Sequence, residues 1–156
     1  MCLIQNKILR KNLESNKLIP FHLAIPVNEL NETAGFYKDV LGCKEGRSSD
    51  KWMDLNFFGH QLVLHISGDK RNEKVNGINP VDGHNVPVPH FGVVLSIDDW
   101  HILEKKLISA NYKFLIEPYI RFKGEPGEQA TMFLYDPSGN ALEFKAFRDI
   151  GMLFAK

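Results

Sequence analysis

Residues 131–147 read TMFLYDPSGNALEFKAF, two apolar runs on either side of a polar turn. The turn, Asp-Pro-Ser-Gly at 136–139, has the residues that a type I turn favours, because Pro presets φ at its second position and Gly suits its fourth. The stretch therefore predicts a β-hairpin. Side chains alternate between faces along a strand, so Glu143 projects opposite Leu142 and Phe144. A carboxylate in mid-strand needs a partner, and the ordinary one would be a Lys or Arg on a neighbouring strand.

The composition predicts a protein with one sizeable hydrophobic core and favours a small molecule as its ligand. The chain has 156 residues, of which 44% are hydrophobic, and this is enough for a single domain or two small fused modules. Its 19 basic and 19 acidic residues cancel, which argues against a nucleic-acid groove or an acidic membrane surface as the partner. Two cysteines are too few for a disulfide framework, and no apolar run reaches the length of a membrane span or forms a signal peptide. We expect a cytoplasmic protein.

The order of predicted elements occurs twice along the chain. PFHLAI at 20–25 and PHFGVV at 89–94 each open a strand, and each strand is followed by a helical pattern and a hairpin. Two such repeats, related by a pseudo-two-fold axis, would bring their histidines to one shared cavity. The expected division is an N-terminal arm, two modules joined by a loop, and a C-terminal tail, at 1–19, 20–67, 68–88, 89–147 and 148–156.

At this point the chain resembles the vicinal oxygen chelate superfamily, which includes glyoxalase I, extradiol dioxygenases, epimerases and the fosfomycin- and bleomycin-resistance proteins. The resemblance rests on FHLAIPV at 21–27, GFYKDVLG at 35–42, PHFGVV at 89–94 and DPSGNALEF at 136–144. It covers about residues 20–147. It implies an α+β fold in which two βαβββ modules form a curved, cup-shaped mixed sheet with a divalent metal ion inside.

The resemblance also implies which residues bind the metal. The family's ligand positions correspond here to His22, His90 and Glu143, a 2-His-1-carboxylate set that leaves coordination positions open for substrate. The family's fourth position corresponds to Val63, where glyoxalase-like members have Glu or Gln. His65 shares a strand face with Val63, so it is a fourth ligand, a catalytic base or a bystander. The ion favoured is Fe(II), with Zn, Ni, Co or Mn as alternatives.

Each of these residues also has an ordinary interpretation. A lone strand histidine is usually a hydrogen-bonded core or surface residue, but the matching repeat positions of His22 and His90, together with Glu143 on the closing strand, favour a metal site. Arg121 and Lys123 fit a solvated loop, or the contact site for an anionic group of the substrate. Phenylalanines in such a chain are more often core than part of a binding site.

Three functions remain open from the sequence. The leading one is an extradiol-type dioxygenase in which the substrate chelates the ion through oxygens and His65 serves as acid or base. A glyoxalase- or epimerase-like lyase or isomerase, with Glu143 moving a proton, is the second. The third is a metal-free protein that sequesters a ligand, as bleomycin-resistance members do. We expect a homodimer, because the family commonly pairs and because the apolar stripe of Ile4 and Ile8 in the arm needs a docking surface.

Overall fold

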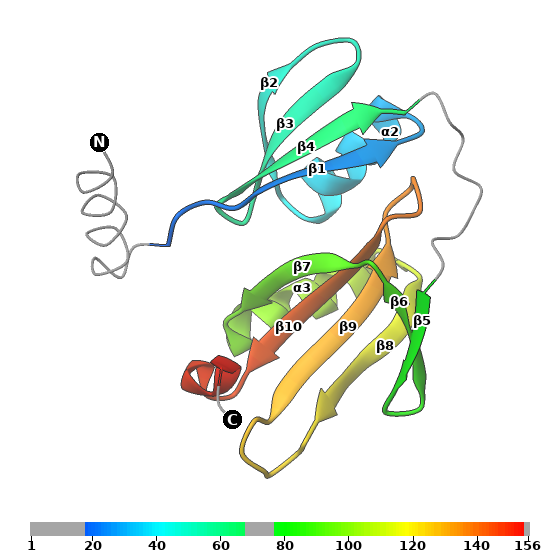
Figure 1. Ribbon diagram of the computed structural model, residues 1–156. Helices are drawn as coiled ribbons and strands as arrows, with labels where there is room; N and C mark the ends of the chain where they lie inside the picture. Colours follow the sequence, from blue (N-terminus) through cyan, green and yellow to red (C-terminus); the bar gives the residue numbers. More distant parts are fainter. Residues whose placement is uncertain (1–17, 68–76, 155–156) are drawn as a thin grey trace, which may run out of the picture.

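The first half of the chain forms a strand, a short helix and three further strands. The computed structural model describes residues 18–67 and 77–154, and Figure 1 shows their arrangement. The elements of this first module are β1 (His22–Val27), α2 (Leu30–Gly35), a π-helical turn η1 (Phe36–Val40), β2 (Lys44–Ser48), β3 (Trp52–Phe57) and β4 (His60–Ile66).

The second half repeats this order after an extra hairpin. The hairpin consists of β5 (Gly77–Val81) and β6 (His84–Val88). The second module then follows, with β7 (Phe91–Leu95), α3 (Ile97–Ser109), β8 (Phe114–Arg121), β9 (Gln129–Tyr135) and β10 (Ala141–Phe147), and a short 3₁₀ helix η2 (Ile150–Phe154) ends it.

Each module builds one four-stranded mixed sheet. The strand orders are β1-β4-β3-β2 and β7-β10-β9-β8, so the two sheets have the same topology. The first strand of each module pairs in parallel with the last, and the other pairs are antiparallel. The predicted α+β class and the two βαβββ modules are thus confirmed. Strand β1 carries His22, and strand β7 directly follows His90. These two strands are edge strands of separate sheets.

Apolar side chains on the helix-covered faces of both sheets form one core. Leu142 and Phe144 of β10 are fully buried there, and Leu62 and Leu64 of β4 belong to the same cluster. Alternation along each strand then places the next residues on the opposite, open face. The predicted orientation of Glu143 is therefore confirmed, because its neighbours in β10 fill the core.

The turn at 136–140 also joins the two modules. Its Asp136 Oδ1 accepts hydrogen bonds from the amides of Ser138 and Asn140, which closes the turn. The buried Tyr37 hydroxyl of the first module donates to Asp136 Oδ2 at 3.1 Å, and the Asn140 side chain donates to Pro26 O at 3.0 Å. The stretch that predicts the hairpin therefore also holds the halves together.

Part of the segment expected to be a loop is ordered secondary structure. The expected linker at 68–88 contains the β5–β6 hairpin, whose strands pair from Gly77 with Val88 to Val81 with His84. In Figure 1 it lies beside β8. Strand β8 extends to Arg121, so this residue, for which a solvated loop was one interpretation, lies at the end of a strand. Gly, Asn and Pro disfavour strands, so these backbone pairings leave little trace in the side-chain pattern.

Two expectations about the ends of the chain have different outcomes. The N-terminal arm, with Ile4 and Ile8, lies outside the described residues. The tail expected at 148–156 contains η2, whose Phe154 is exposed. Among the described residues, no helix is long and apolar enough to cross a membrane.

Candidate metal site

Two of the three predicted ligands meet directly on the open face of the second module. His90 Nε2 lies 3.0 Å from Glu143 Oε2. His90 immediately precedes the edge strand β7, and Glu143 lies in the adjacent β10, paired with Gly92. The Phe133 ring packs against the imidazole at 5.2 Å between centroids. Glu143 is 7% exposed and His90 is half-buried, so the pair is a partly buried donor set at the sheet surface.

The contact between β7 and β10 requires a glycine at residue 92. A Cβ built on Gly92 would lie 1.6 Å from the Glu143 carbonyl oxygen, far closer than atoms can approach. The absence of a side chain therefore lets the strand that follows His90 pair closely with the strand that carries Glu143. The first module has Ala24 at the equivalent place, paired with Val63.

Hydrogen bonds hold the Glu143 carboxylate in a single orientation. Thr131, fully buried on β9, donates its hydroxyl to Glu143 Oε1 at 2.7 Å. The Lys145 ammonium lies 3.3 Å from the same oxygen. Burial alone would raise the pKa of Glu143, but the hydrogen bonds from His90 and Thr131, with the nearby lysine, lower it overall. The group is therefore an anion, the form that binds a metal ion.

The other nitrogen of His90 is also occupied. His90 Nδ1 lies 2.7 Å from the carbonyl oxygen of Pro87, at the end of the β5–β6 hairpin. With Nδ1 donating to Pro87 O, Nε2 donates to Glu143 when the ring is protonated, and loss of that Nε2 proton would leave its lone pair for an ion. The hydrogen bond to Glu143 raises the pKa of His90, against the lowering effect of its partial burial. A proton and a metal ion would thus compete for the space between these two side chains.

His22 has a similar environment but lies on the other sheet. It projects from β1 onto the open face of the first module, and its Nδ1 lies 2.8 Å from Gln61 Oε1. Within residues 18–67 and 77–154, no three His, Cys, Asp or Glu side chains form a group that could hold a metal ion. A single chain therefore joins His90 to Glu143 but does not bring His22 to them, contrary to the shared cavity expected from the repeat.

Strand register places Val63 at the position equivalent to Glu143. Val63 pairs with Ala24, two residues after His22, and Glu143 pairs with Gly92, two residues after His90. The side chain at the fourth family position is therefore apolar and buried. Such a side chain leaves the three-residue set without a fourth protein ligand.

His65 lies on the predicted open face but not beside His22. It pairs with Pro26, four residues after His22 on the adjacent strand. At a rise of about 3.3 Å per residue, the two positions are about 13 Å apart along the strands. The imidazole is exposed. His65 therefore lies further along the open face, and this placement disfavours it as a fourth metal ligand. Lys145 occupies the equivalent position in the second module, paired with Val94.

Several residues of this face were missed by sequence reasoning. Gln61 and Thr131 support a histidine and a carboxylate, and Lys145 extends the polar surface. The rim includes the hairpin, in which the His84 ring packs on Tyr119 and Asp82 Oδ2 lies 2.5 Å from Arg121 Nε. The Arg121 N–H is not aligned for a hydrogen bond, so that contact is an ion pair only. The period-two pattern could have identified Lys145, because it is two residues from Glu143.

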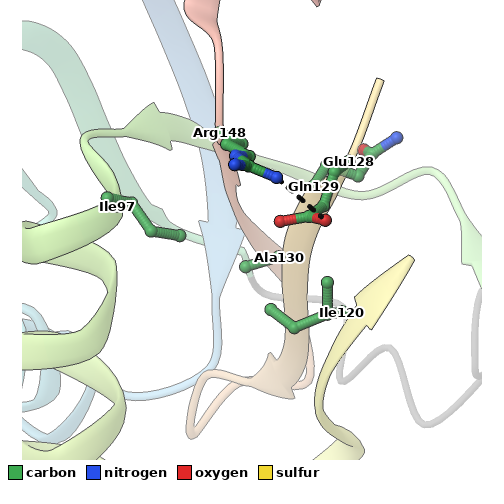
Figure 2. A pocket seen from close by; sticks show the side chains of 6 residues that line it. All are labelled: Ile97, Ile120, Glu128, Gln129, Ala130 and Arg148. Carbon is green, nitrogen blue, oxygen red and sulfur yellow. Dashed lines mark ion pairs between the residues drawn. The ribbon is translucent and has the colours of Figure 1, made fainter. Parts of the chain in front are cut away.

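A separate small pocket lies at the other side of the second sheet. It measures about 150 Å³ and is lined by Ile97, Ile120, Glu128, Gln129, Ala130 and Arg148. Figure 2 shows apolar side chains along its wall and Arg148 turned toward Glu128, with their charged groups 3.8 Å apart. Ala130 belongs to the core face of β9, whereas Thr131 supports Glu143 on the open face. This pocket is therefore distinct from the candidate metal site.

Comparison with known proteins identifies similar sequences and structures. The family model described as the Glyoxalase/Bleomycin resistance protein/Dioxygenase superfamily matches residues 19–144. A glyoxalase/bleomycin resistance protein/dioxygenase from Alicyclobacillus acidocaldarius is 34% identical, with a TM-score of 0.70 over 87% of this chain and 96% of that one. No curated protein sequence matches.

Two more distant structures show the fold alone. The fosfomycin resistance protein FosX from Listeria monocytogenes is 13% identical, with a TM-score of 0.61 over 87% of this chain and 98% of that one. A lactoylglutathione lyase from Agrobacterium tumefaciens is 14% identical, with a TM-score of 0.57 over 90% of this chain and the whole of that one.

Proposed function

Because the chain belongs to the glyoxalase/bleomycin resistance protein/dioxygenase superfamily, we propose that it is a metal-dependent enzyme whose small substrate chelates the ion through oxygens. The observation that carries this proposal is the pair in which Nε2 of the half-buried His90 lies 3.0 Å from Oε2 of the buried Glu143. Such a pair supplies two of the three protein ligands of a 2-His-1-carboxylate centre. The donor types suit Fe(II), and also Zn, Ni, Co or Mn.

Both histidines present the same nitrogen to a ligand. Oxygen acceptors occupy Nδ1 of His22 and of His90, supplied by Gln61 and by Pro87. Metal-binding histidines commonly use their second ring nitrogen in this way, which fixes the tautomer and the ring direction. In both side chains Nε2 is thereby left to bind an ion. This shared feature supports His22 as the third ligand although it lies on the other sheet.

We infer that His22 comes from a second copy of the chain. His22 and the His90–Glu143 pair lie on the open faces of different sheets. His22 lies in the edge strand β1, and His90 directly precedes the edge strand β7. A two-fold symmetric dimer in which β1 of one copy lies beside β7 of its partner would bring the two open faces together twice. Each cup would then contain His22 from one chain and His90 with Glu143 from the other.

The proposed reaction is extradiol-type cleavage of an aromatic diol by dioxygen. A bound Fe(II) ion would supply the redox chemistry and would stabilise negative charge on the substrate oxygens. The chain itself contributes the orientation of the ligands through Thr131, Gln61 and Pro87, and an apolar fourth position at Val63. His65, further along the open face, is the proposed acid or base.

Metal analysis followed by oxygen uptake tests the proposal. Protein reconstituted anaerobically with Fe(II) and desalted should retain the ion and consume dioxygen with one or more members of a catechol panel. Replacing His22, His90 or Glu143 by Ala should abolish stoichiometric binding while the protein stays folded, because all three face a surface that the core does not fill. Glu117→Gln, at an exposed position on β8, is the matched control.

The outcomes distinguish the proposed function from its alternatives. Wild-type protein that retains no divalent ion would contradict the metal site. Retained metal without oxygen uptake, combined with isomerisation of a hemithioacetal, would favour the lyase or isomerase reaction. Ligand binding that is unaffected by the three alanine variants would favour a metal-free sequestering protein.

A further inference from the structure

Lys145 is a charged side chain on the open face that the proposed metal site does not require. It lies two residues after Glu143 on β10, so both project from the same face. Its ammonium is 3.3 Å from Glu143 Oε1, and its side chain is 31% exposed. The residues paired with it are Thr131 on β9 and Val94 on β7. Lys145 therefore lies at the surface that a bound substrate would contact.

The contact with Glu143 does not use all the donors of the Lys145 ammonium. Thr131 already donates to Glu143 Oε1 over a shorter distance, 2.7 Å, so the orientation of the carboxylate does not depend on the lysine. An ammonium has three N–H donors, and Glu143 can take one of them. Arg121 lies further along the same sheet, on β8, and it already forms an ion pair with Asp82. Among the residues that the structure describes, Lys145 is thus the cation on this part of the face with donors to offer a ligand.

Charge balance then determines what kind of ligand is favoured. A divalent ion with two neutral imidazoles and one carboxylate carries one net positive charge, and Lys145 adds a second. At a partly buried site this excess favours ligands that bring two negative charges. A chelating diol or enol that loses one proton supplies the first charge, and a carboxylate elsewhere on the substrate supplies the second.

We propose that Lys145 determines specificity by binding a carboxylate of the substrate beside its metal-chelating oxygens. This inference rests on the proposed metal-dependent function and narrows it to acidic substrates. The lysine would contact the substrate directly through charge-assisted hydrogen bonds while the ion holds the chelating oxygens. Contacts of this kind contribute roughly as much as a 10- to 100-fold change in affinity.

Calorimetry with paired probes tests this proposal on full-length, Zn(II)-loaded protein, in which redox turnover does not interfere. The probes are 2,3- and 3,4-dihydroxybenzoate and their methyl esters, which share the chelating diol and differ in one negative charge. We expect at least one acid to bind about 10-fold or more tightly than its ester. In Lys145→Met this preference should disappear while the ester affinity stays within about two-fold, because the ester makes no charged contact.

Two further variants separate specificity from a general charge effect or a structural role. Lys113→Met removes the same charge at an exposed position before β8 and should keep the preference for the acid. Lys145→Arg should retain most of it. Metal stoichiometry and thermal unfolding of Lys145→Met should match the wild type.

Each other result overturns the inference in a recognisable way. Equal binding of acids and esters to the wild type, no binding of any probe to metal-loaded protein, or a retained preference in Lys145→Met would show that Lys145 does not select the substrate. Loss of metal in Lys145→Met would show that it positions Glu143 instead. If the wild type itself binds no metal, the proposed function fails with it, and metal analysis detects this before any probe is added.

Discussion

At the scale of single residues, the site depends on groups that hold a ligand rather than on the ligands alone. Thr131 does not contact the proposed ion, yet its buried hydroxyl fixes one oxygen of Glu143 and leaves the other facing His90. Second-layer hydrogen bonds of this type commonly change metal affinity by 10- to 100-fold. A threonine in an apolar strand attracts no attention in a sequence. Its role appears only when Glu143 is found on the neighbouring strand.

Thr131→Val therefore tests the importance of this support. Valine has nearly the same shape but cannot donate a hydrogen bond, so Glu143 should lose its fixed orientation and metal affinity should fall about 10- to 100-fold. Competition titration against a chromogenic chelator measures the change. Thr33→Val, a buried threonine whose hydroxyl lies 2.7 Å from that of Ser138 in the turn, is the control and should leave metal affinity unchanged. Equal affinity in wild type and Thr131→Val would contradict the role assigned to this hydroxyl.

At the scale of elements, the close approach of β7 to β10 builds the His90–Glu143 pair. The two strands are parallel, with Gly92 opposite Glu143, and a side chain at residue 92 has no room. The helix-covered side of the same strands fills the core with Phe144 and Leu142. The strands therefore cannot separate locally without disturbing the packing beneath them.

Gly92→Ala should be strongly destabilising. The added Cβ would meet backbone atoms of Glu143, which cannot move aside as a flexible side chain could. We expect the free energy of unfolding to fall by about 3 kcal/mol, at the upper end of the range for overpacked cores. Urea denaturation followed by fluorescence measures it.

Gly35→Ala is the matched control for this substitution. Gly35 is the last residue of α2, and its added Cβ would meet only Asp39 Oδ2 at 3.8 Å. The same chemical change should stabilise here by about 0.5–1 kcal/mol, because alanine favours helix more than glycine does. Similar effects at both glycines would show that the β7–β10 contact is not the cause.

At the scale of the whole molecule, the pairing of open faces decides whether the site is complete. The core and the turn at 136–140 hold the two modules of one chain together through their helix-covered sides. The faces that carry His22 and Glu143 are the opposite ones. Assembly of two chains therefore becomes part of the chemistry that we propose, since each site would need residues from both.

Mixed dimers of two inactive chains test this assembly directly. His22→Ala and Glu143→Ala chains, each with a different histidine-free affinity tag, are co-expressed and isolated by two successive affinity steps. A site shared between chains predicts about one metal ion per mixed dimer, because one of its two cups keeps an intact ligand set. Each variant alone should bind none. Elemental analysis of the doubly purified sample gives the ratio.

Two results would contradict the shared site. A mixed dimer without metal, from chains whose wild-type dimer holds about two ions, would place the complete site within one chain. A wild-type sedimentation mass near the 17.8 kDa of the monomer at micromolar concentration would exclude the dimer itself.

The local pattern determined most of the fold and part of the site. The two-residue period of a strand is enough to place Glu143 opposite the core, and the repeated order of elements is enough to equate His22 with His90. Both predictions depend on short-range geometry, which side-chain character records directly. The α+β class and the modules follow from the same information.

Only the tertiary structure decided how these elements meet. The partners of the predicted ligands are Gln61, Thr131 and the Pro87 carbonyl, and they lie on other strands or in the β5–β6 hairpin. Hairpin pairing is made by backbone groups that every residue carries, so its Gly-, Asn- and Pro-containing strands leave no apolar alternation to detect. The repeat predicts that the two open faces are equivalent. Which faces meet within one chain is decided instead by the packing of apolar side chains from both modules into a single core, because that packing removes apolar surface from water and leaves His22 apart from His90 and Glu143.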